Sequence, residues 1–253
     1  MTKTESLLRL IKSGYSQILK DNLIGIYLHG SYVLGSYNYS VSDLDYLVVV
    51  KNPLSFKDKQ QLMDFTTDNL WPIAPAKGLE FHVLLLKNTQ HFSHPMPFDL
   101  HFSKAHYGEY LADKKRYLIN MHGKDPDLAA HIMITNRFGK TLIGNPIDSV
   151  FSDVPKNIYW SSIYFDIASA KKEISEQPTY IILNLCRVLE YKKTQAITSK
   201  LDAGAWGIRF SPKYAAMIKL ALQNYTNTNL TRKKFIQKDL DNFAKYMLAN
   251  ITE

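Results

Sequence analysis

The hydrophobic positions along the chain change their spacing near residue 150. Before it, short apolar runs bounded by turn residues predict buried strands at 23–28, 43–50 and 79–86. After Pro155, apolar residues recur every three or four positions over 158–172, 180–191 and 214–225, which predicts helices. Breaker residues at 144–146 and 153–155 separate the two parts. We therefore expect an α+β fold, with strands and helices in residues 1–153 and a helical domain in residues 154–253.

Two carboxylates at the start of the second predicted strand are the most informative chemical feature. Asp43 and Asp45 follow the turn at Gly30-Ser31, with eleven residues in between. Side chains alternate across a strand, so both carboxylates point to one face, about 6 to 7 Å apart along the chain. The apolar run after them enters a core where unpaired charge is unfavourable, and a divalent cation shared with phosphate oxygens removes the repulsion. The pattern therefore predicts Mg²⁺ on Asp43 and Asp45, beside a nucleotide.

A third carboxylate, Glu80, opens the next predicted strand. At the start of a neighbouring strand, its carboxylate could take a proton from an attacking hydroxyl group. Metal ions would stabilise charge on the transferring phosphorus and the leaving pyrophosphate. The alternative is a solvated glutamate at a strand end. Geometry decides between the two.

The run from Gly30-Ser31 to Asp43-Leu44-Asp45-Tyr46 resembles the signature of the DNA polymerase β-like nucleotidyltransferase superfamily. Further segments resemble the aminoglycoside (3'')(9) and (9) adenylyltransferases. They are Asp125-Pro126-Asp127-Leu128-Ala129, Leu142-Ile143-Gly144, Ile182 to Arg187, Ile197 to Lys200, and Ala203 to Trp206. The resemblance covers roughly residues 20 to 225.

This resemblance implies an N-terminal nucleotidyltransferase domain with a mixed sheet and a C-terminal α-helical bundle that closes over ATP and the acceptor. It implies Mg²⁺-dependent transfer of AMP from ATP to a hydroxyl group of an aminoglycoside or aminocyclitol, and hence antibiotic resistance. Asp43 and Asp45 would bind Mg²⁺, and Glu80 would be the catalytic base. The residues implied to contact ATP are Gly30, Ser31, Ser42, Arg187, Lys200 and Tyr225.

The resemblance also bears on the acceptor. Relatives that modify both streptomycin and spectinomycin have a Trp and an acidic residue shortly before the helix that carries Arg187. Residues 173–180 contain no Trp here, so spectinomycin is favoured over streptomycin. Tyr110 stands where the antibiotic enzymes usually have Trp. It either shapes the acceptor site or packs in the core.

The positive net charge is compatible with acceptors other than an antibiotic. The net charge is +8, with basic clusters at Lys192-Lys193 and Arg232-Lys233-Lys234. RNA, a protein or an unrelated small molecule are alternative acceptors, and a catalytically silent nucleotide-binding protein is a further alternative. The sequence contains no RNP-like motif, no zinc-finger spacing and no long basic stretch with aromatics, so we do not expect a nucleic-acid partner. The three intact carboxylates argue against a silent protein.

The remaining composition limits the cellular context. The single cysteine, Cys186, lies in an apolar helical stretch and is expected in the core, without a disulfide. No apolar run approaches the roughly 18 residues of a membrane span, and the N-terminus does not read as a signal peptide. The histidines between residues 91 and 106 match no familiar zinc spacing. We expect a cytoplasmic protein without membrane partners. The family resemblance implies that a monomer suffices, since both halves of the cleft come from one chain.

Overall fold

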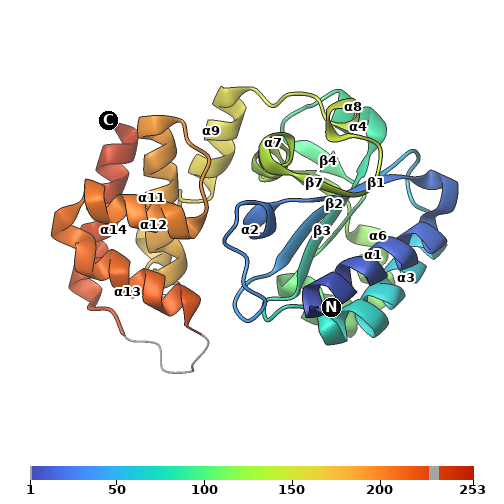
Figure 1. Ribbon diagram of the computed structural model, residues 1–253, viewed down its shortest axis with the longest axis horizontal. Helices are drawn as coiled ribbons and strands as arrows, with labels where there is room; N and C mark the ends of the chain where they lie inside the picture. The colour runs from blue at the N-terminus through green and yellow to red at the C-terminus, as the bar shows by residue number, and fades with distance from the viewer. Residues whose placement is uncertain (1, 228–233) are drawn as a thin grey trace. The chain divides into compact units, whose positions relative to one another are not determined.

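The computed structural model describes residues 2–227 and 234–253, so Arg232 and Lys233 of the second basic cluster lie outside the described residues. The chain forms two compact units, Met1–Tyr159 and Trp160–Glu253 (Figure 1). The first contains strands and helices, and the second is helical. This arrangement confirms the predicted α+β fold class. The division between the units falls within helix α9 (Lys156–Phe165).

The first unit is built on a five-stranded mixed sheet of order β5-β3-β2-β1-β7. β2 and β3 run parallel, and the other neighbouring pairs are antiparallel. The strands are β1 (Leu23–Leu28), β2 (Leu44–Val50), β3 (Leu79–Leu85), β5 (Leu100–Phe102) and β7 (Lys140–Gly144). A second small sheet pairs β4 (Met96–Phe98) with β6 (Gly123–Asp125). The three predicted strands are confirmed, with β2 and β3 each one residue shorter than expected.

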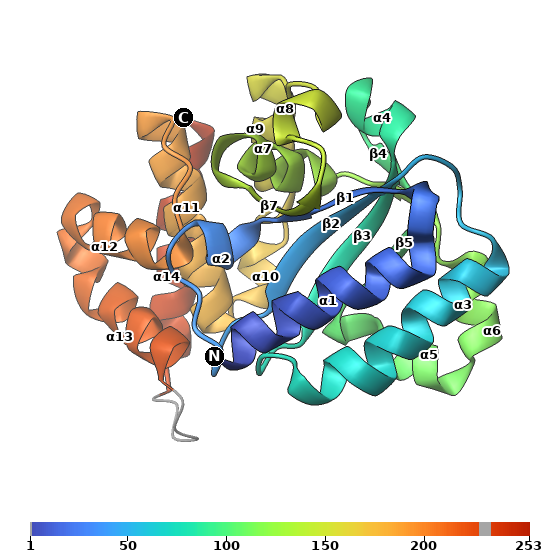
Figure 2. The same ribbon diagram turned by 45° about the vertical axis from the view of Figure 1, so that its right-hand side comes forward.

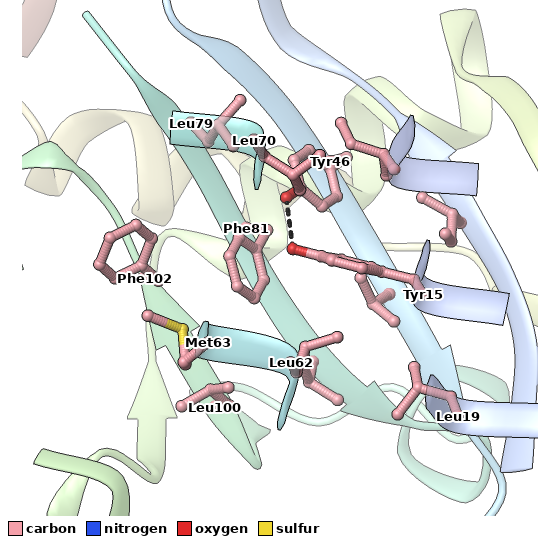
Figure 3. Packing of buried hydrophobic residues seen from close by; sticks show 14 of the residues in the cluster. Tyr15, Leu19, Tyr46, Leu62, Met63, Leu70, Leu79, Phe81, Leu100 and Phe102 are labelled. Carbon is pink, nitrogen blue, oxygen red and sulfur yellow. Dashed lines mark hydrogen bonds between the residues drawn. The ribbon is translucent and has the colours of Figure 1, made fainter. Parts of the chain in front are cut away.

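One face of the five-stranded sheet packs against α1 (Lys3–Leu19), α3 (Phe56–Phe65), α5 (Tyr107–Ala112) and α6 (Lys114–Asn120) (Figure 2). Its centre is aromatic. Tyr46 and Phe81 are fully buried and stack with their ring centroids 5.2 Å apart. The Tyr15 hydroxyl group forms hydrogen bonds with the hydroxyl groups of Tyr46, at 2.9 Å, and Thr66, at 2.8 Å (Figure 3 shows the first). The polar tips of buried tyrosines are therefore paired, as burial requires.

Tyr110 also belongs to this core. Its ring is fully buried, and its hydroxyl group donates to Asp64 at 3.3 Å. The position that resembles a Trp of the antibiotic enzymes therefore packs inside the first unit, which favours the packing role over direct contact with an acceptor.

The opposite face of the sheet carries the alternate positions of each strand. Leu47 and Val49 of β2 and Leu84 of β3 are buried there. Helix α7 (Leu128–Phe138) covers this face, on the side of the sheet opposite α1 and α3 (Figures 1 and 2). Where β2 and β3 begin, the positions on this face are polar instead of apolar. The candidate reactive groups therefore lie at this end of the sheet. The shorter helices of the unit are α2 (Gly30–Val33), α4 (Leu86–Gln90) and α8 (Ile147–Val150).

The second unit is organised around α11 (Pro178–Thr194), which packs against α12 (Lys200–Phe210), α13 (Ala215–Thr226) and α14 (Gln237–Thr252). Cys186 is fully buried on α11, which confirms its predicted place in the core. None of the helices in the described ranges is long and apolar enough to cross a membrane.

The predicted continuous helix over 158–172 is wrong. The chain leaves the helical conformation at 166–169, between α9 and α10 (Ala170–Glu173). That segment contains neither Gly nor Pro, so its local sequence permits a helix. The Asp166 carboxylate accepts hydrogen bonds from three side chains of α11, and we attribute the break to these tertiary contacts.

Candidate active site

The structure brings three sequence-predicted carboxylates together at the start of β2 and β3. Asp43, Asp45 and Glu80 offer oxygen atoms that all lie within 4.8 Å of one another. The parallel register pairs Asp45 directly with Glu80, and Asp43 lies two residues before Asp45 on the same face. All three side chains are half-buried. A set of oxygen ligands with this spacing suits Mg²⁺, which takes carboxylates together with phosphate oxygens.

Gly30 makes the carboxylate group possible. It has a φ of +62°, in the left-handed region, and a Cβ atom added to it would lie 1.9 Å from Asp45 Oδ2. Only glycine allows the chain to turn here and leaves room for the carboxylate. The backbone N–H of His29 donates to the carbonyl oxygen of Asp45 at 3.1 Å, which ties the turn to β2.

The two predicted phosphate-contacting serines lie in different settings. Ser31, on α2 beside Gly30, has a buried Oγ atom with no hydrogen-bond partner among the described residues. Ser42 is buried, and its Oγ atom accepts a hydrogen bond from the backbone N–H of Asn38 at 3.1 Å. A buried hydroxyl group without a partner is unfavourable unless a ligand supplies one, so Ser31 fits a site for phosphate oxygens.

Glu80 borders a group of histidines that the sequence patterns did not reveal. His101 Nε2 lies 3.7 Å from Glu80 Oε1, which is an ion-pair distance when the ring is protonated but too long for a hydrogen bond. Burial raises the pKa of Glu80, but His101 and the neighbouring histidines outweigh burial and lower it to about 2. Glu80 is therefore ionised at neutral pH, as a cation ligand or a proton acceptor must be.

The histidine group extends from Glu80 along β3 and onto β5. His82 and His101 stack with ring centroids 3.8 Å apart, and His82 Nε2 lies 3.0 Å from Asp125 Oδ2. Burial lowers the pKa of His82 to about 4, and the hydrogen bond to Asp125 only partly opposes that shift. His131 of α7 packs against His29, with ring centroids 4.7 Å apart and an interplanar angle of 31°. His82 and His101 lie on the same sheet face as Glu80 because alternation along β3 and the register of β3 with β5 put them there, whereas their sequence spacing carries no signal.

In the helical unit, the predicted ATP-contacting cations lie around one aspartate. Asp166 accepts hydrogen bonds from Tyr180 at 3.1 Å, from Asn184 at 2.7 Å and from Arg187 at 3.3 Å. Lys200 Nζ lies 4.3 Å from the centroid of the Tyr180 ring, which makes a cation–π contact. Arg187 and Lys200 are therefore held near each other, although they are on different helices.

Asp166 is the residue of this group that sequence reasoning missed. It lies where a continuous helix was predicted, so nothing in the local pattern pointed to it. Tyr225, the third predicted contact of this unit, is partly buried near the end of α13.

Comparisons with known families match one family model to the N-terminal part of the chain and another to the C-terminal part. A model described as "Nucleotidyltransferase domain" matches residues 9–90 and thus includes all three carboxylates. A model described as "Aminoglycoside adenylyltransferase, C-terminal domain" matches residues 149–250.

Individual relatives agree with these matches. The chain is 27% identical to a spectinomycin 9-adenylyltransferase of Enterococcus faecalis over 226 residues, which is 84% of this chain and 83% of that protein. It is 39% identical to a putative protein adenylyltransferase of Methanocaldococcus jannaschii over 79 residues, 31% of this chain and 71% of that protein. The crystal structure of an Enterococcus spectinomycin adenyltransferase, AAD(9), with ATP and spectinomycin has the same fold. Its TM-score is 0.83 at 22% identity, over 98% of this chain and 99% of that one.

The role of Gly30 can be tested with a matched pair of glycines. We expect Gly30→Ala to weaken binding of Mn²⁺, a spectroscopic analogue of Mg²⁺, by at least about tenfold, because the added Cβ displaces a ligand carboxylate. Electron paramagnetic resonance of free Mn²⁺ measures this directly. Gly35 also has a positive φ, +76°, but a Cβ there meets nothing within 4 Å. Gly35→Ala should share the backbone strain and keep Mn²⁺ affinity; equal losses in both variants would contradict the assignment.

The buried histidines make the stability acid-sensitive. An unfolded His82 binds its proton near pH 6.5, whereas the native one does so only near pH 4. Between these values the unfolded state holds more protons, so stability decreases as pH falls through this window, by up to about 3 kcal/mol for this one residue. Urea unfolding from pH 7 to pH 4 measures the slope. His82→Gln should flatten it and the exposed control His91→Gln should not; an unchanged slope in His82→Gln would contradict the buried, neutral state.

Proposed function

Because this chain is a nucleotidyltransferase of the aminoglycoside adenylyltransferase family, we propose that it transfers AMP from ATP to a hydroxyl group of spectinomycin. The observation that carries the proposal is the group of Asp43, Asp45 and Glu80, whose oxygen atoms lie within 4.8 Å of one another beside Gly30 and Ser31. The similarity to a spectinomycin 9-adenylyltransferase over most of both chains supports the choice of acceptor.

In this proposal, Asp43 and Asp45 would hold Mg²⁺, and the two serines would contact the phosphates. Mg²⁺ bound there would supply positive charge to the triphosphate and to the leaving pyrophosphate. Ser31 would donate its hydroxyl proton to a phosphate oxygen, which gives its buried Oγ a partner. Ser42 accepts from Asn38 and so keeps its own proton free for the same use. Gly30 contributes the space in which a phosphate and the Asp45 carboxylate can approach the backbone.

Glu80 acts on the acceptor. Its ionised carboxylate takes the proton of the attacking hydroxyl group, whose oxygen forms a bond to the α-phosphorus of ATP. The bond from that phosphorus to the bridging oxygen breaks, and pyrophosphate leaves with the bonding electrons. The products are AMP-spectinomycin and pyrophosphate, and Glu80 then releases the proton to solvent.

The helical unit supplies further contacts to ATP. Arg187 and Lys200 would bind the triphosphate, and Tyr225 would contact the nucleotide. The contacts of Arg187 with Asp166 and of Lys200 with the Tyr180 ring restrict both side chains before ATP arrives, which lowers the entropy lost on binding. One chain carries both matched domains, so we propose that a monomer suffices and that it works in the cytoplasm, where ATP is available.

A second candidate acceptor is a protein hydroxyl group. The 39% identity to a putative protein adenylyltransferase over 79 residues favours it, but that match covers only 31% of this chain. The match to the C-terminal model over residues 149–250 therefore makes the antibiotic the first candidate.

The acceptor can be identified by mass spectrometry. We expect purified protein with Mg²⁺-ATP to add one AMP unit to spectinomycin, with stoichiometric pyrophosphate release, and to leave streptomycin unmodified because residues 173–180 lack the Trp. Asp45→Asn serves as the control for contaminating activity.

Modification of streptomycin at a comparable rate would contradict the specificity. Failure with both drugs, together with transfer of labelled AMP to a protein, would favour the second candidate instead.

A further inference from the structure

A second group of possible metal ligands lies on the same face of the sheet as the carboxylates. His82 of β3, His101 of β5 and Asp125 of β6 each offer a ligand atom, and these atoms lie within 4.8 Å of one another. Among the described residues, this is the one such group besides Asp43, Asp45 and Glu80. We propose that His82, His101 and Asp125 bind a transition-metal ion, Zn²⁺ above all, at a site separate from the carboxylates that bind Mg²⁺.

The distances fit an ion with short bonds to nitrogen and oxygen. His82 Nε2 and Asp125 Oδ2 are 3.0 Å apart. Two ligands at about 2.0–2.2 Å from Zn²⁺ lie about 2.8–3.6 Å from each other for angles of about 90° to 109°. The ion can therefore replace the proton that this pair now shares, with little movement of either side chain.

His101 supplies the third ligand. Its Nε2 is buried and has no hydrogen-bond partner within the described part of the chain. Its ring lies parallel to His82, at an interplanar angle of 8°, so it must tilt out of the stack to point its lone pair at an ion near His82. The tilt gives up the ring contact with His82 and the 3.7 Å approach to Glu80. In exchange, the nitrogen gains a metal bond in place of a contact that is too long for a hydrogen bond.

The backbone already fixes the group. His82 and His101 are directly paired in the antiparallel register of β3 and β5. Asp125 accepts a hydrogen bond from the backbone N–H of Asp127 at 2.8 Å, which orients its carboxylate. Outer hydrogen bonds of this kind are what hold the ligands of metal sites in position. His131 Nδ1 is also buried and without a hydrogen-bond partner among the described residues, and its ring centroid lies 5.7 Å from that of His82.

Ligand chemistry separates the two sites. Three carboxylates present only oxygen and suit Mg²⁺, whereas two imidazoles and one carboxylate suit Zn²⁺ and its neighbours in the first transition series. The low pKa of His82 means that its imidazole is neutral at pH 7 and can bind a metal without first losing an excess proton.

Zinc binding can be measured without ATP or antibiotic, so the result does not depend on the proposed function. Chelator-treated full-length protein in excess Mg²⁺, which occupies the carboxylates, is titrated with Zn²⁺ by calorimetry and with Co²⁺ by visible absorption. We expect one ion per chain with micromolar affinity, and a Co²⁺ spectrum of nitrogen and oxygen ligands.

Four variants make the test specific. His101→Gln and Asp125→Asn should each weaken Zn²⁺ binding by at least about tenfold. His91→Gln, at an exposed histidine, and Asp45→Asn, at the Mg²⁺ ligands, should leave it unchanged. Circular dichroism and urea unfolding confirm that each variant is folded.

Two results would overturn the proposal. One is that the wild-type protein binds Zn²⁺ no more tightly than the His101→Gln and Asp125→Asn variants do. The other is loss of Zn²⁺ binding in Asp45→Asn alone, which would place the ion on the carboxylates.

Discussion

The parallel register of β2 and β3 is the constraint on which the site depends. It sets Asp45 beside Glu80 and, two residues further on, Leu47 beside His82. Two carboxylates so close would repel each other, and the strands tolerate them because burial of Tyr46, Phe81 and their neighbours on the opposite face fixes the pairing. A slip by one residue would move every one of these side chains to the other face. The apolar core and the polar site are therefore two consequences of one register.

The same alternation explains why the site has two chemical zones. Along this face, carboxylates lie at the beginning of β2 and β3, and histidines follow them on β3 and β5. Gly30 leaves room for the carboxylates, because any larger residue would take the space of the Asp45 carboxylate. In the helical unit, Asp166 has a comparable ordering role, since it fixes Arg187 and Tyr180 by direct hydrogen bonds. Both units thus position charged groups through a few short polar contacts on a packed scaffold.

Much of the fold could be predicted from the sequence because its signals are local. Apolar runs located the strands at 23–28, 43–50 and 79–86, and the change in spacing near residue 150 separated sheet from helices. The carboxylates could be found because Asp43 and Asp45 lie on one strand after a Gly-Ser turn. The group of His82, His101 and Asp125 could not, because it joins three strands through register and tertiary packing. Asp166 was missed for a similar reason: its helix ends through contacts with α11, which no local pattern encodes.

The central proposal is that Asp45 would hold Mg²⁺, and the nucleotide through it, while Glu80 would act on the acceptor. Measuring ATP affinity and kcat side by side in Glu80→Gln and Asp45→Asn tests it most directly. The account predicts that Glu80→Gln binds Mg²⁺-ATP nearly as the wild type does and loses about 100-fold or more in kcat, as removal of a general base does. Asp45→Asn should lose Mg²⁺-dependent ATP binding as well as turnover. Turnover at the wild-type rate in Glu80→Gln would contradict the account.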